Sequence, residues 1–360
     1  MPVNTWSWLK VNTIDTELYV NRRPEIKSNI NIISPPEIEI KNDIENITLG
    51  ESFENYFATP SMRKFMEENK TSGHYIRIPA GFQSKESIEI TFKIDEKNTL
   101  ISEDLIIEAE AGSRAILIIK YQSEDEREGY HTGRLRVMVH RDAELKIVKA
   151  QLFSSSVKHN DYNEAVVMDK GRLKLIQPEI GAKTIESSWN VVLTEAESEA
   201  EMDILYVGEA KKTLDFTTQV KFLAAETKAV VNAKGVLTGE SKKVFRDTLD
   251  FRKGAKGAKG REAESVLMLS PKVRNISAPL LLCQEDDVEG EHAASSGRPD
   301  EEVLFYLMGR GLSEAEAQKM LAEASFTEIL DQIPEQAIKQ SVLELLGQAI
   351  EKGGKALCIH

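Results

Sequence analysis

The chain has 360 residues, of which 41% are hydrophobic and 29% charged, a composition that predicts a folded chain with a sizeable core. Its net charge of −13 excludes nucleic acid and anionic membrane surfaces as main partners, because like charges repel. It has two cysteines, too few for a disulfide framework, and neither a visible signal peptide nor an apolar run long enough to span a bilayer. We therefore expect a soluble cytoplasmic protein.

Residues 1–72 are expected to form a mixed N-terminal region with helical content. Trp6 and Trp8 lie in an apolar cluster near the start, which we expect to pack against another part of the chain. Aromatic and methionine residues recur at roughly helical spacing over residues 51–70. They predict a helix that is interrupted near Pro60.

Residues 73–275 show the two-residue alternation of β-strands and no convincing long helix. Segments 110–117, 142–147 and 170–175 each place a small residue before a polar one and then a short apolar run. These segments and weaker copies recur roughly every 26–31 residues, a period typical of stacked repeats. The pattern favours a parallel β-helix whose chain turns at the small residue. A β-sandwich is the alternative that the pattern leaves open.

Residues 276–360 are expected to form a helical region. It begins with a buried strand at residues 280–283, followed by an acidic loop over residues 285–300. Three helices are then predicted, at residues 301–308, 312–330 and 334–352. Ser313 and Glu316 have the spacing of a capping box. The apolar stripe of these helices must cover the β domain or a partner protein.

His292 is the strongest candidate for chemistry. It lies among carboxylates, and a neutral imidazole beside carboxylates suits a borderline metal such as ferrous iron. An exposed loop histidine is the alternative. Cys283 is expected to be a small buried hydrophobic residue. Nothing in the spacing of the four histidines in the strand region brings any two together, so core or surface roles are expected for His74, His131, His140 and His159.

Enzymatic signatures are absent from the sequence. It contains no G-x-S-x-G, H-E-x-x-H or C-x-x-C motif, and the glycine-rich run at residues 254–261 lacks the spacing of a phosphate-binding loop. The acids at residues 285–291 are a candidate for acid–base work on a sugar, as in carbohydrate-active β-helix enzymes. The low aromatic content of 6% and the lack of a visible secretion signal disfavour that function.

Two stretches resemble a known family. Residues 285–298 are similar to the pattern DDV-x-x-x-H-x-A-x-x-G, and residues 300–317 to DEE-x-LFYL-x-x-RG-x-x-x-x-EA, both found in the SufB/SufD family of iron–sulfur cluster assembly proteins. The resemblance implies a mainly β fold, a right-handed parallel β-helix core with flanking α-helical N-terminal and C-terminal parts. It also implies a non-enzymatic scaffold subunit that pairs with a SufB-like subunit and docks a SufC-like ABC ATPase.

The resemblance is closer to SufD than to SufB, because residues 261–270 lack the cysteine that SufB-like chains keep there. Gly290 stands where SufD-like chains often have cysteine, and Leu282 where they often have an acid. By resemblance, His292 is the interface histidine that binds or positions iron or a nascent cluster, and Glu291 is a weaker candidate. We expect the isolated chain to hold no cofactor tightly.

The family pattern also implies which helical residues bind the ATPase. They lie on the two helices after residue 300 and in the turn between them: Phe305, Tyr306, Arg310, Gly311, Leu312 and Leu321. The alternative function is a stand-alone β-helix protein that binds iron or another metal and forms a homodimer.

Overall fold

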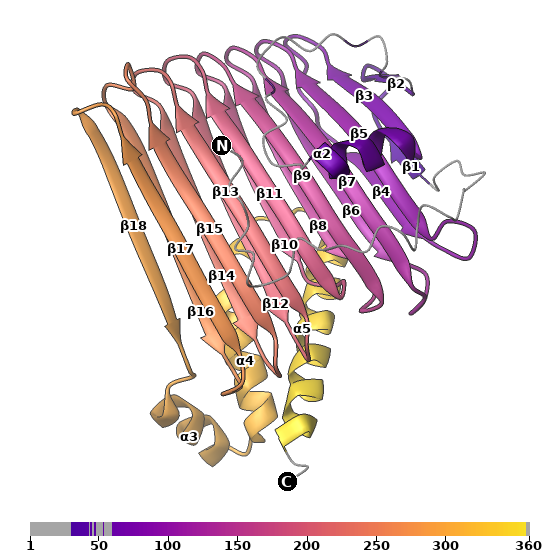
Figure 1. Cartoon of the computed structure of the whole chain (residues 1–360), viewed down its shortest axis with the longest axis vertical. Coiled ribbons are helices and arrows are strands. Elements are labelled where there is room, and N and C mark those ends of the chain that lie inside the picture. The colour runs from indigo at the N-terminus through magenta and orange to yellow at the C-terminus, as the bar shows by residue number, and fades with distance from the viewer. Residues whose placement is uncertain (1–29, 43, 45–46, 48–52, 54–59, 358–360) are drawn as a thin grey trace.

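The computed structural model describes residues 30–42, 44, 47, 53 and 60–357. The predictions for Trp6 and Trp8 lie outside these residues. The chain forms a parallel β-solenoid in which successive strands from β3 onward alternate between two facing nine-stranded sheets (Figure 1). Within the described residues, four helices accompany the solenoid, at Pro60–Glu68 (α2), Glu301–Gly309 (α3), Glu314–Leu330 (α4) and Gln336–Leu357 (α5).

The first sheet, here called sheet A, contains β1 (Ile30–Ile33), β4 (Ile88–Ile94), β6 (Arg114–Ser123), β8 (Glu144–Leu152), β10 (Arg172–Glu179), β12 (Glu199–Gly208), β14 (Lys228–Leu237), β16 (Ala258–Met268) and β18 (Val288–Gly297). Sheet B contains β2 (Glu39–Lys41), β3 (Ser72–Ile78), β5 (Leu100–Ala109), β7 (Gly129–Val139), β9 (Val157–Val167), β11 (Thr184–Leu193), β13 (Thr213–Phe222), β15 (Lys242–Phe251) and β17 (Arg274–Cys283). Among the described strands, the antiparallel pairs are β1 with β4 and β2 with β3, at the N-terminal end.

The strand register explains the sequence repeat. Paired residues of neighbouring rungs lie between 26 positions apart, as for Lys158 and Thr184, and 32 apart, as for Lys242 and Arg274. Parallel pairing between strands one rung apart confirms the β-helix and excludes the sandwich. Left-handed backbone occurs at the predicted corners, at Gly112, Asp142 and Lys170. In the second and third copies the left-handed residue directly precedes the small one.

The core fills the space between the two sheets with stacked side chains. Because neighbouring rungs are in register, inward-facing residues of adjacent strands lie directly above one another. Phe222 and Phe251 stack in this way, with ring centroids 4.3 Å apart. Where a ring needs more room the next rung carries glycine: a Cβ at Gly235 would lie 2.0 Å from the ring of its strand partner Tyr206.

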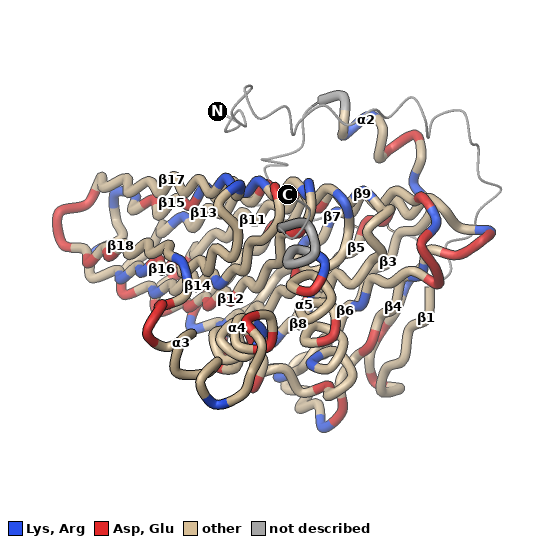
Figure 2. Tube along the Cα trace, turned by 90° about the horizontal axis from the view of Figure 1, so that it is seen from below, with Lys and Arg blue, Asp and Glu red and all other residues tan. Residues whose placement is uncertain are grey.

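Helices α4 and α5 cover the outer face of sheet A (Figure 2). Phe326, Ile329 and Leu346 are buried there against Val148 and Ile176. The three C-terminal helices are confirmed, as is the capping box formed by Ser313 and Glu316. The apolar stripe of α4 and α5 therefore covers the β domain of the same chain.

Two predictions near residue 290 are wrong. Residues 280–283 do belong to a strand, β17, but their side chains are exposed because no later rung covers them within residues 60–357. Residues 288–297 form strand β18 and not a loop. The acids of β18 made this strand resemble a loop. They occupy alternate positions that face outward at the edge, where Glu289 forms an ion pair with Lys259 of the preceding rung.

Candidate functional site

The solenoid ends in an open rung made of β17 and β18. Each is the last strand of its sheet in the described part of the chain, so one edge of its backbone is left for another partner (Figure 1). Leu280 is 51% exposed, and Leu281 and Leu282 are exposed as well. Cys283 is also exposed, which contradicts the prediction of a buried residue. The β17 side of this rung is therefore an apolar strand edge with no further strand beside it among the described residues.

His292 lies on this rung and faces the inside of the solenoid. Its strand partner in the preceding rung is Glu262, and the Nδ1 atom of His292 lies 2.5 Å from Oε2 of Glu262. The His292 side chain is 37% exposed, whereas that of Glu262 is 5% exposed. Burial raises the pKa of Glu262, and the hydrogen bond to His292 opposes that shift. The carboxylate thus holds the ring from within, at the boundary between core and solvent.

Glu262 belongs to a group of buried polar side chains behind the open rung. Glu264 accepts hydrogen bonds from Lys243 and from Tyr206, the latter at 2.7 Å. Asp247 accepts a hydrogen bond from the Thr218 hydroxyl, and burial raises its pKa to about 8, with added repulsion from Glu262 and Glu264. This charged interior continues directly behind His292.

Glu291, predicted beside His292, points the other way. Neighbouring residues of a strand alternate between its faces, so Glu291 lies on the outer face. It is 3.9 Å from Arg261 and largely exposed. Gly290 shares the inner face with His292, and a Cβ there would lie 2.9 Å from Leu281. The structure brings His292 together with Glu262 and separates it from Glu291.

The arrangement leaves one nitrogen of His292 available. When Nδ1–H donates to the Glu262 carboxylate, Nε2 carries the lone pair, which is the form that binds a metal ion. Carboxylate–histidine pairs of this kind orient the ring and raise its basicity toward a metal. Among the described residues no cysteine or further histidine completes a three-ligand group with His292. A complete site at this rung would need ligands from another chain.

The helices after the solenoid present a second exposed surface. Helix α3 has no buried residue, and Phe305 is 79% exposed with Tyr306 beside it. Arg310 stacks on the Tyr306 ring with its guanidinium 5.1 Å from the ring centroid. Gly311, with φ +100°, turns the chain into α4. Helix α3 is therefore a largely apolar helix with large side chains exposed to solvent.

The other predicted docking residues are less exposed. Leu312 is half-buried, as is Leu321, which lines a groove of about 540 Å³ between α4 and the ends of β14, β16 and β18. The six predicted residues thus lie on α3, on the turn after it and on the first half of α4.

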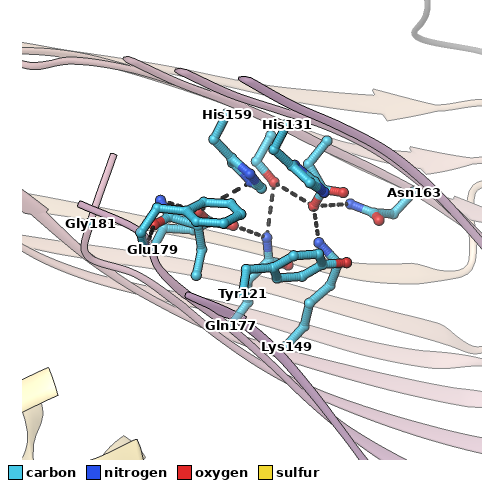
Figure 3. A network of polar contacts seen from close by, with 12 residues as sticks. Tyr121, His131, Lys149, His159, Asn163, Gln177, Glu179 and Gly181 are labelled. Carbon is cyan, nitrogen blue, oxygen red and sulfur yellow. Dashed lines mark hydrogen bonds and ion pairs between the residues drawn. The ribbon is translucent and has the colours of Figure 1, made fainter. Parts of the chain in front are cut away.

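The interior also holds a polar network that sequence reasoning missed. His131 and His159, partners in adjacent rungs, stack with ring centroids 4.6 Å apart (Figure 3). Burial lowers the pKa of His159 well below its ordinary value. The two histidines are 28 residues apart, as are Gln151 and Glu179. Aligning the repeats in register would have placed them together.

Comparisons with known proteins agree with this architecture. Residues 92–325 match the family described as "SUF system FeS cluster assembly, SufBD core domain". The SufD iron–sulfur cluster assembly protein of Bacillus subtilis is 30% identical over 145 residues, 40% of this chain and 33% of that protein. A SufBD-family protein of Staphylococcus saprophyticus is 24% identical over 292 residues, 79% of this chain and 63% of that protein.

The chain spans less than two thirds of the length of these relatives. None of its described helices is both long enough and apolar enough to cross a membrane. The family match covers most of the solenoid, the open rung, α3 and the first part of α4. The chain belongs to the SufBD family of iron–sulfur cluster assembly proteins.

Proposed function

We propose that this chain is a non-enzymatic scaffold subunit of a cytoplasmic Suf-type iron–sulfur cluster assembly complex. Its open last rung pairs with a SufB-like subunit, and α3 with the start of α4 docks a SufC-like ABC ATPase. The observation that carries the proposal is the open rung, where β17 exposes Leu280, Leu281 and Leu282 and β18 carries the partly exposed His292. An unpaired strand edge with apolar side chains favours strand addition by a second β-protein.

The nascent cluster, or iron on its way to one, is the cargo of this interface. His292 supplies one ligand through Nε2, and the partner supplies the remaining ligands. Under this proposal the isolated chain retains no cluster, because a single half-exposed imidazole binds iron weakly. The Glu262 carboxylate behind the ring sets its orientation before the partner arrives.

Docking of the ATPase rests on a separate observation. Phe305 and Tyr306 are large, exposed and adjacent on a short helix that lies below the C-terminal ends of β16 and β18 (Figure 1). Aromatic side chains of this kind commonly provide the anchoring contacts of protein interfaces. A partner that moves α3 would act on the chain segment directly after β18, the strand that holds His292.

A second candidate function is a homodimeric metal-binding protein. The same open rung, paired with its copy about a two-fold axis, would bury the three leucines and bring two His292 residues toward one interface. This function needs no ATPase.

Co-expression with the SufB-like and SufC-like proteins of the same organism, followed by affinity purification and native mass determination, separates the two functions. The scaffold predicts a complex that contains all three proteins. Replacement of Leu281 by lysine should release the SufB-like subunit, whereas truncation after Arg298 should release the ATPase. Recovery of a homodimer alone, with neither protein attached, would contradict the scaffold.

A further inference from the structure

The polar network inside the solenoid lies far from the open rung along the stack of strands. It occupies three consecutive rungs near the turn that joins sheet A to sheet B, and its members are fully buried (Figure 3). His159 and Asp161 come from β9, and Glu179 comes from the end of β10. Burying unpaired charges costs free energy, and the proposed scaffold function does not explain why these charged groups lie in the core.

Three of these residues offer ligand atoms to one point. One donor atom each from His159, Asp161 and Glu179 lies within 4.8 Å of the other two. The Nε2 atom of His159 is 3.6 Å from Oε2 of Glu179. In a tetrahedral metal site with bonds near 2.0–2.2 Å, ligand atoms lie about 3.5 Å apart, so side-chain shifts of about 1 Å close the set.

Two of these three residues carry possible ligand atoms that make no hydrogen bond within the described residues. Within the described part of the chain, neither ring nitrogen of His159 makes a hydrogen bond, and the same holds for Oδ1 of Asp161. Buried polar atoms are normally satisfied, so two orphaned groups at one point indicate a missing occupant. Gly181 shapes the adjoining turn, because a Cβ there would lie 1.9 Å from the carbonyl oxygen of Phe153.

Neighbouring side chains already hold each carboxylate in place. The second oxygen of Asp161 accepts hydrogen bonds from Lys149 and, at 2.8 Å, from Asn163. Glu179 accepts from Gln177 at 2.5 Å and from Gln151 at 3.3 Å. Outer contacts of this kind orient ligands and are typical of metal sites.

The charge balance also favours a cation. The network contains three buried carboxylates, from Glu103, Asp161 and Glu179, and the ammonium group of Lys149, while a second ammonium, from Lys212, lies at its edge and donates to the carbonyls of Ile180 and Gly181. Glu103 already accepts hydrogen bonds from Tyr121 and His131. The uncompensated negative charge therefore lies toward Asp161 and Glu179, where the orphaned donor atoms are.

We propose that His159, Asp161 and Glu179 bind one divalent transition-metal ion inside the solenoid. One imidazole and two carboxylates are a donor set suited to Zn²⁺, Fe²⁺, Mn²⁺ or Co²⁺ rather than to the thiolate-preferring Cu⁺. The ion is structural: it ties β9 to β10 across the interior and is enclosed as the rungs form. This inference is independent of the proposed interface at His292.

The test uses the full chain expressed in minimal medium that contains Co²⁺ or Zn²⁺, then purified in buffer with EDTA so that weakly held ions are lost. Metal content is measured by mass spectrometry, and the Co²⁺ ligands by X-ray absorption. We expect one ion per chain with nitrogen and oxygen ligands. The variants Asp161→Asn and Glu179→Gln, which keep side-chain size, should lower metal content at least about tenfold.

Two variants serve as controls. His292→Ala removes the exposed histidine and should leave metal content unchanged, so failure here is distinguishable from failure of the interface proposal. His131→Gln changes the stacked neighbour that is outside the ligand set, and should also retain the ion. Metal-free wild-type protein would overturn the proposal, as water would then be the occupant. The proposal would also be overturned if His131→Gln and His159→Gln lost metal to the same extent. It would likewise be overturned if wild type and all ligand variants had the same metal content.

Discussion

The Nδ1 atom of His292 lies 2.5 Å from Oε2 of Glu262, one rung earlier in sheet A. This pair joins a half-exposed ring at the open edge to a carboxylate within the core. It fixes which nitrogen of the imidazole faces outward, and it makes Glu262 a positioning residue for any ligand bound at His292.

Replacement of His292 by alanine should lower the cluster yield of the reconstituted complex without unfolding the chain, since the ring is partly exposed and contributes little to the core. Glu262→Gln should weaken iron binding at the interface about tenfold or more, because the ring loses its anionic partner. Iron content and the visible absorption of the cluster measure both effects.

Glu291→Ala is the matched control, since its side chain leaves the same strand on the opposite face, next to Arg261. It should give the wild-type cluster yield. A yield that falls with Glu291→Ala but not with His292→Ala would place the site on the outer face and refute the assignment.

Gly235→Ala should destabilise the solenoid by about 1–3 kcal/mol, because the new methyl group would overlap the buried ring of Tyr206. Tyr206 has little freedom to move, since its hydroxyl donates to Glu264 at 2.7 Å. Urea unfolding measures the change. Gly297→Ala, where nothing lies within 4 Å, should be close to neutral, and equal effects at the two sites would contradict the register described for β12 and β14.

Asp247 predicts a pH dependence of stability. Burial raises the pKa of this carboxyl to about 8 in the folded chain, from 3.8 for the unperturbed group. Between these values the folded chain holds a proton that the unfolded chain has released, so this group makes the free energy of unfolding fall as pH rises through that window. Asp247→Asn, which stays neutral, should flatten the decline between pH 5 and about 8 relative to wild type. Parallel stability curves for both proteins would show that the carboxyl is not protonated in the folded state.

Phe305→Asp should abolish ATPase docking while leaving the fold intact, because the side chain is almost fully exposed on α3. Affinity purification with the SufC-like protein measures docking, and circular dichroism checks the fold. Leu223→Asp, at an exposed position on the solenoid just after β13, is the control and should dock normally. Normal docking by Phe305→Asp would move the ATPase surface away from α3.

The repeat period made the solenoid predictable, because a rung of fixed length imposes its spacing on every strand. The helices after residue 300 were predictable from their caps and apolar stripes. Strand β18 was not, since an edge strand has no second neighbour and tolerates acids and small residues that resemble a loop. The exposure of Leu281 and Cys283 was missed for the same reason: sequence apolarity does not reveal which rung is last.

The candidate site was predictable only in part. His292 stood out through its local motif, but Glu262 is 30 residues away and becomes its neighbour only through the register of β16 and β18. The same holds for His131 and His159. Contacts between rungs depend on the alignment of repeats, which a local motif does not contain.

The helix pair α4 and α5 alters how a solenoid can come apart. Rungs of a repeat protein ordinarily contact only their neighbours, so such proteins can open one rung at a time. Here one apolar interface joins the helices to residues from Ile118 on β6 to Leu269 just after β16, and Lys120 is ion-paired with Glu335. The helices thereby hold the middle rungs together, so these rungs should unfold as a single unit. The last rung lies outside this interface. The strand that holds His292 is therefore the part of the sheet that can separate or pair again at the lowest cost in free energy.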